Sequence, residues 1–233
     1  MIPDGVHTFS FTFELGDREL AIHPVAVETD HGLVLVDVGL PGALDRFRDA
    51  LDEREFSLSD CSLVVLTHHD SDHVAGLAEI ERETPVIVTA HADEAPYVDG
   101  RRRPVKIGPD DERYPPVTVD LELSGEETFH TAAGPMWVVE TPGHSPGHVS
   151  LYFPDHQFLV AGDALTNDGG AVPDDVAGTF GGPKPAYTPN MARAVESVGR
   201  LAELDVETVH CYHGGTAEVG TAEVAAVYDS LRA

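Results

Sequence analysis

The sequence predicts an α/β fold in which two similar halves pack their sheets face to face and carry their helices on the outside. Apolar extended segments are followed by segments with helical spacing, and this order occurs twice along the 233 residues. A polar stretch with prolines at 101–116 separates the two occurrences. We therefore expect one domain over 1–233, with pseudo-repeated halves at about 1–100 and 117–233.

The first half alternates between strands and helices. Alternating or continuous apolar runs predict strands at 6–14, 21–28, 34–38, 63–67 and 86–89. The spacing of Leu44, Phe47 and Leu51 predicts a helix, because these residues share one helical face. Further helices are expected at 74–83 and 91–97.

The second half begins again with strands and ends in helices. Strands are predicted near 117–123, 137–141, 149–153, 158–161 and 209, and helices at 189–204 and 217–231. Between them, a loop at 165–187 is rich in glycine and proline. A loop of this length is rarely a mere connection, so we expect it to act as a lid over a substrate site.

Composition argues against nucleic-acid and membrane partners. Forty-one acidic and 14 basic side chains give a formal net charge of −27, and only Lys106 and Lys184 among the basic residues are lysines. This balance favours adaptation to a cytoplasm near saturating salt, and an ordinary acidic protein is the alternative. No stretch approaches the roughly 18 apolar residues that cross a bilayer, and the start of the chain does not resemble a signal peptide. We expect a cytoplasmic protein that acts on a small molecule; its oligomeric state is left open.

The segment at 67–76 carries the strongest chemical signal. It reads Thr-His-His-Asp-Ser-Asp-His-Val-Ala-Gly, follows a buried strand and opens a helix. Residues two apart on an extended loop project the same way, so His68 and Asp70 can converge on one ion. Asp72 and His73, at the helix start, can turn toward a second ion. Helix capping would explain one aspartate, but not the histidines beside it.

Further candidate ligands follow strands in the second half. His144 and His148 lie in the turn Thr-Pro-Gly-His-Ser-Pro-Gly-His at 141–148, whose glycines and prolines fix a tight bend. Asp163 and His213 come directly after two other predicted strands. Because strand ends gather along one edge of a two-sheet fold, a common site for these side chains is geometrically reasonable.

Taken together, these motifs resemble the metallo-β-lactamase superfamily. Its pattern is Thr-His-x-His-x-Asp-His, then Thr-Pro-Gly-His, then Gly-Asp, then a final histidine, and this chain follows that order along nearly its whole length. The second motif is typical of the glyoxalase II-like branch. The resemblance implies a four-layer αββα sandwich with a dinuclear metal site at its edge.

Ligand roles follow from the resemblance, residue by residue. The first ion would be held by His68, Asp70 and His144, the second by Asp72, His73 and His213, with Asp163 bridging them. Asp37 and His148 match positions that orient ligands without binding metal. The remaining histidines match no ligand position, and we expect them on the surface or in the core.

Asp70 departs from the family pattern, because most members have histidine there. Either Asp70 is a ligand, since carboxylates bind zinc and iron, or the first site is weak and the enzyme is mononuclear. The neighbouring His69 could not substitute for it without twisting the loop. If Asp70 is a ligand, we expect the site to tolerate iron or manganese more widely.

The resemblance implies a metal-dependent hydrolase that uses a metal-bound hydroxide to cleave an ester, thioester or lactone. Its cofactors would be two divalent ions, zinc or alternatively iron or manganese, and Asp72 would be the catalytic residue that orients the nucleophile. The carboxylate of Asp70 also suggests an iron-dependent redox enzyme of the same fold, either a diiron reductase or a persulfide dioxygenase. A metal-binding scaffold without turnover is a third class.

Overall fold

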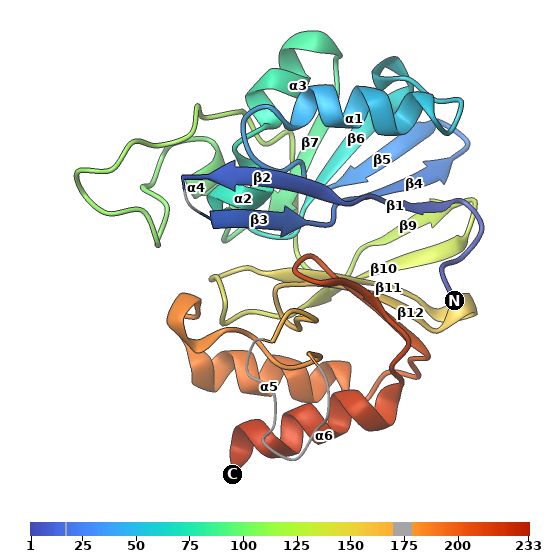
Figure 1. Cartoon of the computed structure of the whole chain (residues 1–233), viewed down its shortest axis with the longest axis vertical. Coiled ribbons are helices and arrows are strands. Elements are labelled where there is room, and N and C mark those ends of the chain that lie inside the picture. Colours follow the sequence, from blue (N-terminus) through green and yellow to red (C-terminus); the bar gives the residue numbers. More distant parts are fainter. Residues whose placement is uncertain (17, 170–178) are drawn as a thin grey trace. The chain divides into compact units, whose positions relative to one another are not determined.

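The computed structural model describes residues 1–16, 18–169 and 179–233, and the chain divides into two compact units. The amino-terminal unit is Gly5–Ser124, and the carboxy-terminal unit combines Met1–Asp4 with Gly125–Ala233. Each unit contains a mixed sheet with helices on one of its faces (Figure 1). The mixed α/β class predicted from the sequence is therefore confirmed.

The described part of the amino-terminal unit contains a six-stranded sheet in the order β1-β4-β5-β6-β7-β8. Its strands are β1 (Val6–Thr8), β4 (Val25–Thr29), β5 (Gly32–Val36), β6 (Cys61–Leu66), β7 (Ile87–His91) and β8 (Leu121–Leu123). The neighbours from β5 to β8 pair in parallel, so these strands end at the same edge of the sheet. Residue 37 and the segment 67–73 follow the ends of β5 and β6 at that edge.

Two of the predicted strands are divided in the structure. The expected strand at 6–14 is β1 followed by β2 (Phe11–Leu15), and the strand at 21–28 is the end of β3 (Arg18–Ile22) followed by β4. β2 and β3 form their own antiparallel ribbon. The second division falls at Pro24, which has no N–H to donate to a strand partner.

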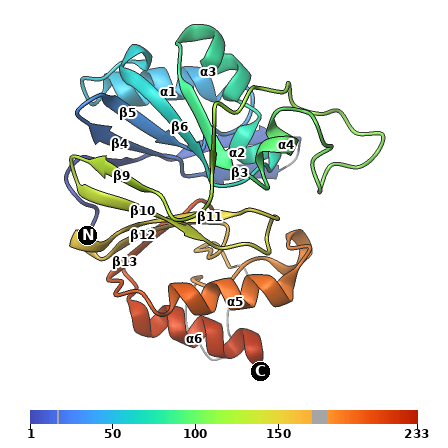
Figure 2. The same ribbon diagram turned by 180° about the vertical axis from the view of Figure 1, so that it is seen from behind.

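Helices α1 (Ala43–Asp52) and α3 (Leu77–Glu83) lie on the same face of this sheet (Figures 1 and 2). Helix α1 buries Phe47, whose ring meets the rings of Phe9 and Phe11 at centroid distances of 5.7 and 4.9 Å. Such edge-to-face contacts add to the burial energy of the rings. The helix predicted from the apolar spacing is confirmed.

Two other helices differ from the prediction. The helix expected at 74–83 is divided in the structure into the end of α2 (Ser71–Val74) and the whole of α3. The division falls at Gly76, whose N–H bonds to the carbonyl of Gly39 at 2.9 Å. A side chain at Gly76 would put its Cβ 2.8 Å from the Val38 carbonyl oxygen, so only glycine fits this close approach. His91 belongs to β7, and the helix expected at 91–97 is reduced to α4 (Ala95–Val98).

The described part of the carboxy-terminal unit contains a second six-stranded sheet, in the order β14-β13-β12-β11-β10-β9. Its strands are β9 (Thr128–Thr131), β10 (Gly134–Glu140), β11 (Val149–Phe153), β12 (Phe158–Gly162), β13 (Thr208–Cys211) and β14 (Gly215–Ala217). Strands β12 and β13 are parallel, and β10 runs in the same direction because β11 is antiparallel to both of its neighbours. These three strands therefore end at one edge.

Helices α5 (Met191–Leu201) and α6 (Thr221–Arg232) lie side by side over one face of this sheet (Figures 1 and 2). Val198 of α5 and Val224 of α6 enter one apolar cluster with the sheet residues Leu159 and Val209. The helix predicted at 217–231 begins later, because Ala217 pairs with Val209 at the end of β14. Each fully buried aliphatic side chain of this kind contributes roughly 1.5–3 kcal/mol.

The loop predicted as a lid at 165–187 lies partly outside the described residues, which omit 170–178. On either side of the omitted part, Thr166 and Gly181 exchange two backbone hydrogen bonds of 2.9 and 2.8 Å. Short 3₁₀ turns stand at η1 (Leu58–Asp60), η2 (Pro154–His156) and η3 (Pro185–Tyr187).

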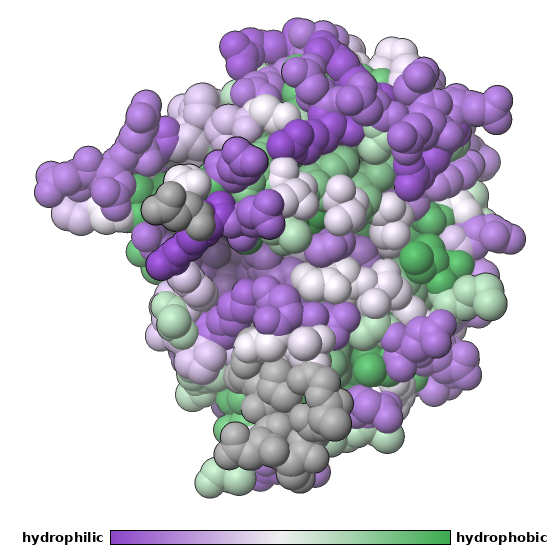
Figure 3. All heavy atoms as spheres, in the orientation of Figure 1, coloured by the Kyte–Doolittle hydropathy of each residue, from purple (hydrophilic) through white to green (hydrophobic). Residues whose placement is uncertain are grey.

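Hydrophilic side chains cover the face of α1 and α3 that Figure 3 displays, as the acidic composition leads one to expect. Among the described residues, no helix is both long and apolar enough to cross a membrane.

The two cysteines are expected to be unreactive in the native protein. Cys61 and Cys211 are both buried, and burial raises the pKa of the Cys61 thiol to about 12 and that of Cys211 well above its ordinary value. At pH 8 only about one in 10⁴ Cys61 thiols would be the reactive thiolate. A chromogenic disulfide reagent should therefore label neither thiol until guanidinium unfolds the chain. Rapid labelling of the folded protein would contradict this burial.

Candidate functional site

Asp37 anchors the polar residues at the strand ends of the amino-terminal unit. It follows β5, is 1% exposed, and adopts φ +58°, a conformation that aspartate tolerates better than most residues. Its Oδ1 accepts the backbone N–H of Thr67 at 2.8 Å. Its Oδ2 accepts the Thr67 hydroxyl at 2.7 Å and Nδ1–H of His73 at 2.8 Å. One buried carboxylate thus holds the end of β6 and the start of α2.

These bonds fix which nitrogen carries the proton in two histidines. The Thr67 hydroxyl has a single proton, which it donates to Asp37, so it must accept from Nδ1 of His68 at 3.0 Å. His68 and His73 both therefore carry their proton on Nδ1. Their Nε2 atoms keep the lone pair that a metal requires. The two buried rings lie 4.0 Å apart, centroid to centroid.

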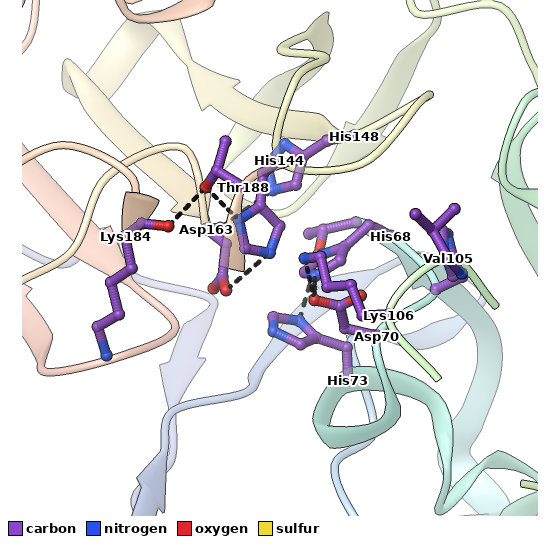
Figure 4. A network of polar contacts seen from close by, with 12 residues as sticks. His68, Asp70, His73, Val105, Lys106, His144, His148, Asp163, Lys184 and Thr188 are labelled. Atoms are coloured by element: carbon purple, nitrogen blue, oxygen red, sulfur yellow. Dashed lines mark hydrogen bonds and ion pairs between the residues drawn. The ribbon is translucent and has the colours of Figure 1, made fainter. Parts of the chain in front are cut away.

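Asp70 lies between a histidine and a lysine of the same unit. Its Oδ2 is 3.2 Å from Nε2 of His68, and the same oxygen forms an ion pair with Nζ of Lys106 (Figure 4). Lys106 stands 36 residues further along the chain, so no local motif could have predicted this contact. The side chains of Asp70 and Lys106 are 13% and 20% exposed, which makes this a largely desolvated pair.

His69 has a structural role that the sequence did not reveal. Its Nδ1 donates to the buried carboxylate of Glu94, and its Nε2 accepts the backbone N–H of Val105 at 3.1 Å. Its ring stacks on Tyr97 at 4.2 Å, and its carbonyl oxygen accepts the hydroxyl of Tyr114 at 2.9 Å. Burial, with the charge of Glu94 adding to it, raises the pKa of Tyr114, so this hydroxyl remains a donor. His69 is a core residue that ties down the segment around residue 105.

Asp72 stands in the first turn of α2, one residue before His73. A carboxylate oxygen of Asp72 and a ring nitrogen of His73 lie within 4.8 Å of each other. Asp72 is half-buried, whereas His73 is fully buried. The structure thus brings together two pairs of the predicted ligands in this unit, His68 with Asp70 and Asp72 with His73.

In the carboxy-terminal unit the predicted ligands follow β10, β12 and β13. The turn after β10 depends on Gly143, whose φ is +134° and where a Cβ would lie 2.2 Å from the backbone nitrogen of Ala194. Glycine is therefore required there, and it places His144 at the strand end. Asp163 directly follows β12, and His213 comes two residues after β13.

Asp163 lies next to two histidines of its own unit. Its Oδ2 is 3.3 Å from Nε2 of His144 and 3.5 Å from Nε2 of His213. All three residues are at most 7% exposed. One carboxylate oxygen therefore lies close to two imidazole nitrogens of the same unit.

The hydroxyl of Thr188 orients the imidazole of His144. Thr188 donates its proton to the carbonyl of Lys184 at 2.8 Å, so it accepts from Nδ1 of His144 at 3.2 Å (Figure 4). His144 therefore also carries its proton on Nδ1 and presents the lone pair of Nε2. Lys184 itself pairs with Asp168 at 2.6 Å.

His148 uses both ring nitrogens within the protein. Its Nε2 accepts the backbone N–H of Asp163 at 3.0 Å, and its Nδ1 donates to the hydroxyl of Thr141 at 2.8 Å. Two further hydrogen bonds extend this series: the hydroxyls of Thr141 and Ser150 lie 3.0 Å apart, and the Ser150 hydroxyl donates to the Ala161 carbonyl at 3.0 Å. With both nitrogens occupied, His148 positions Asp163 and does not bind metal itself.

The donor distances fit a tetrahedral divalent ion. Two ligands at bond lengths of about 2.1 Å on such an ion lie about 3.4 Å apart. Among the proposed ligands, the imidazole–carboxylate separations from His68 to Asp70 and from Asp163 to its two histidines are 3.2, 3.3 and 3.5 Å. In His68 and His144 the hydrogen bond at Nδ1 leaves Nε2, the nitrogen that faces the carboxylate, as the atom that could bind a cation together with the carboxylate oxygen. The donor chemistry therefore fits a metal ion.

Two mixed sheets with histidine and aspartate donors at their strand ends describe a known class of metal-binding α/β proteins. The family model of the metallo-beta-lactamase superfamily matches residues 18–213, and the chain belongs to that superfamily. A metallo-beta-lactamase family protein from Thermus thermophilus has a TM-score of 0.72 at 23% identity, over 98% of this chain and 78% of that one. A metallo-beta-lactamase from Pontibacter korlensis has a TM-score of 0.73 at 16% identity, over 100% and 97%. These likenesses confirm the fold.

Curated relatives point to hydrolases. The Bacillus subtilis protein named "Probable metallo-hydrolase YflN" is 30% identical over 201 residues, which are 79% of this chain and 76% of the relative. A hydroxyacylglutathione hydrolase of Cereibacter sphaeroides is 36% identical over 116 residues. That match covers 50% of this chain but only 37% of the relative.

Proposed function

We propose that this chain is a metal-dependent hydrolase that cleaves an ester, thioester or lactone, with two divalent ions held as the family pattern assigns them. His68, Asp70 and His144 would hold one ion, Asp72, His73 and His213 the other, and Asp163 would bridge. The grouping of donors from both units around common ions rests on the family pattern. Zinc is the proposed metal, and iron or manganese is the alternative that Asp70 allows.

The observation that carries this proposal is the set of oriented donors in each unit. In His68, His73 and His144 a hydrogen bond occupies Nδ1 and leaves Nε2 for a metal ion. A hydrogen bond at the ring nitrogen that does not bind the metal is what orients a metal-binding imidazole. The names of the curated relatives support hydrolysis, and the second denotes attack on an acyl carbon.

When bound, divalent ions supply Lewis acidity that favours ionisation of water and polarises a carbonyl group. The chain's own residues provide position and proton transfer. Asp72, at the solvent-accessible start of α2, would orient the attacking water and take its proton. Asp163 donates its backbone N–H to His148, and this bond would hold its carboxylate beside the imidazoles of His144 and His213.

A substrate panel tests the proposed activity. Protein prepared without chelators and loaded with zinc should hydrolyse at least one member of a set of esters, thioesters and lactones in molar potassium chloride, the medium that the composition suggests. Removal of metal by a chelator should abolish the turnover, and added zinc should restore it. Asp72→Asn should lose at least about 100-fold in kcat while remaining folded, because general-base assistance is worth about that much.

The same preparation separates hydrolysis from redox chemistry. The one feature that favours an iron enzyme is the carboxylate of Asp70, at a position where most family members have histidine. Iron in the purified protein together with oxygen consumption, and no hydrolysis of any panel member, would replace the proposed function by an iron-dependent redox reaction. Zinc-dependent hydrolysis without oxygen consumption is the outcome that we expect.

A further inference from the structure

Lys106 is a cation built into the group of proposed metal ligands. It lies between α4 and β8, and its ammonium group pairs with Oδ2 of Asp70, the same oxygen that stands 3.2 Å from Nε2 of His68. Figure 4 shows Lys106 beside the Asp70 carboxylate. The family pattern contains no lysine at this point, and no sequence motif includes it.

The position of Lys106 is set by the fold and does not depend on its own side chain alone. The preceding residue, Val105, donates its N–H to Nε2 of His69 at 3.1 Å. His69 is in turn held by Glu94 and by the Tyr114 hydroxyl. Because His69 directly precedes Asp70 and Val105 directly precedes Lys106, one buried ring joins the two short segments that carry the ion pair.

We propose that Lys106 competes with a divalent ion for Asp70 and thereby weakens the metal site that contains His68 and Asp70. This inference rests on the proposed function, because it requires that His68 and Asp70 bind metal. Lys106 forms an ion pair with Asp70, which in the proposed assignment is a ligand of the ion that His68 also holds. The two ions would therefore bind with unequal affinities.

Geometry and charge together give the reason. A metal ligand oxygen lies about 2.1 Å from its ion, and an ammonium group on that same oxygen must then approach the ion closely. At the low effective dielectric of a largely buried site, repulsion between a divalent ion and a fixed ammonium is substantial. Either the ammonium leaves Oδ2 of Asp70 or the ion binds weakly. The bond from the Val105 N–H to His69 keeps the Lys106 backbone beside Asp70, so the ammonium group stays within reach of this oxygen.

Zinc titration of metal-free protein tests the competition directly. We expect the wild type to bind one ion tightly and a second at least about tenfold more weakly, a difference of the size that charge changes near a metal produce. Lys106→Met keeps the aliphatic stem and removes the charge, and Lys106→Gln keeps polarity without charge. Both should bind the second ion at least about tenfold more tightly than the wild type does. Lys106→Arg keeps the charge and should behave as the wild type.

Lys184→Met is the matched control, because Lys184 is the only other lysine and its partner is Asp168. It should leave both zinc affinities unchanged. Circular dichroism and thermal unfolding verify that each variant is folded, and the glutamine and arginine variants keep the test decisive if the methionine variant does not fold.

The outcomes distinguish the inference from the function on which it rests. If the wild type binds zinc but the neutral variants bind the second ion no more tightly, Lys106 does not compete for Asp70 and the inference fails alone. If no folded variant binds zinc, the proposed function fails and takes the inference with it. Tighter binding by both neutral variants, with Lys106→Arg unchanged, is the result that we expect.

Discussion

Replacement of Asp163 by alanine is expected to abolish hydrolysis and to remove bound metal. Its Oδ2 lies 3.3 and 3.5 Å from Nε2 of His144 and His213, so one truncation would take a donor from both proposed ions. Loss of a residue that merely supports a ligand costs 10–100-fold in metal affinity or activity, so loss of a shared ligand should lower kcat by about 10³-fold or more. Asp163→Asn should be nearly as damaging, because the amide keeps the shape but loses the charge.

The measurement combines steady-state rates on any substrate found in the panel with metal analysis of the same samples. Asp155→Ala serves as the control, since Asp155 is an exposed carboxylate in the turn that precedes β12, at the opposite end of the strand from Asp163. It should retain wild-type metal and rates. Full metal content and activity in the Asp163→Ala protein would remove Asp163 from the ligand set.

Replacement of Asp37 by alanine is expected to destabilise the fold by about 3–5 kcal/mol. The carboxylate accepts three buried hydrogen bonds, from the N–H and hydroxyl of Thr67 and from His73. Each buried donor left unsatisfied costs about 1–3 kcal/mol. The backbone at φ +58° adds strain, because alanine adopts this conformation less readily than aspartate.

Equilibrium unfolding in urea, in the same high-salt buffer, measures this cost. Asp37→Asn is the informative comparison, because asparagine accepts the backbone conformation but replaces one acceptor oxygen by an NH₂ group that faces donors. It should be destabilised less than the alanine variant but still by more than about 1 kcal/mol. An alanine variant within about 1 kcal/mol of the wild type would show that the network around Asp37 does not hold β6 and α2 together.

The sequence predicts the strand-end residues well because two signals coincide there. Apolar runs such as 63–67 identify buried strands, and the polar motif that follows each run must then lie at the edge of a sheet. The structure places His68 after β6, Asp163 after β12 and His213 after β13, as this reasoning requires. The division of the helix at Gly76 was not predictable, since it depends on a contact with Gly39 that is distant in sequence.

Long-range partners are what sequence patterns leave out. The pairing of Asp70 with Lys106 and the bond from His69 to Val105 each join residues 36 positions apart. No periodicity or spacing rule relates such positions, because they meet only through the packing of separate elements. The short strands β9 and β14 escaped prediction for a related reason: three or four residues give too little alternation to read.

Zinc titration of the metal-free wild-type chain and of its His73→Ala variant measures whether the strand-end donors bind metal. His73 is held by Asp37 and, in the proposed assignment, binds the tighter ion. The wild type should bind at least one zinc ion per chain tightly, and His73→Ala should bind that ion at least about 100-fold more weakly. A folded wild-type protein that takes up no zinc, or a His73→Ala variant with undiminished zinc affinity, would show that these donors do not form the proposed metal site.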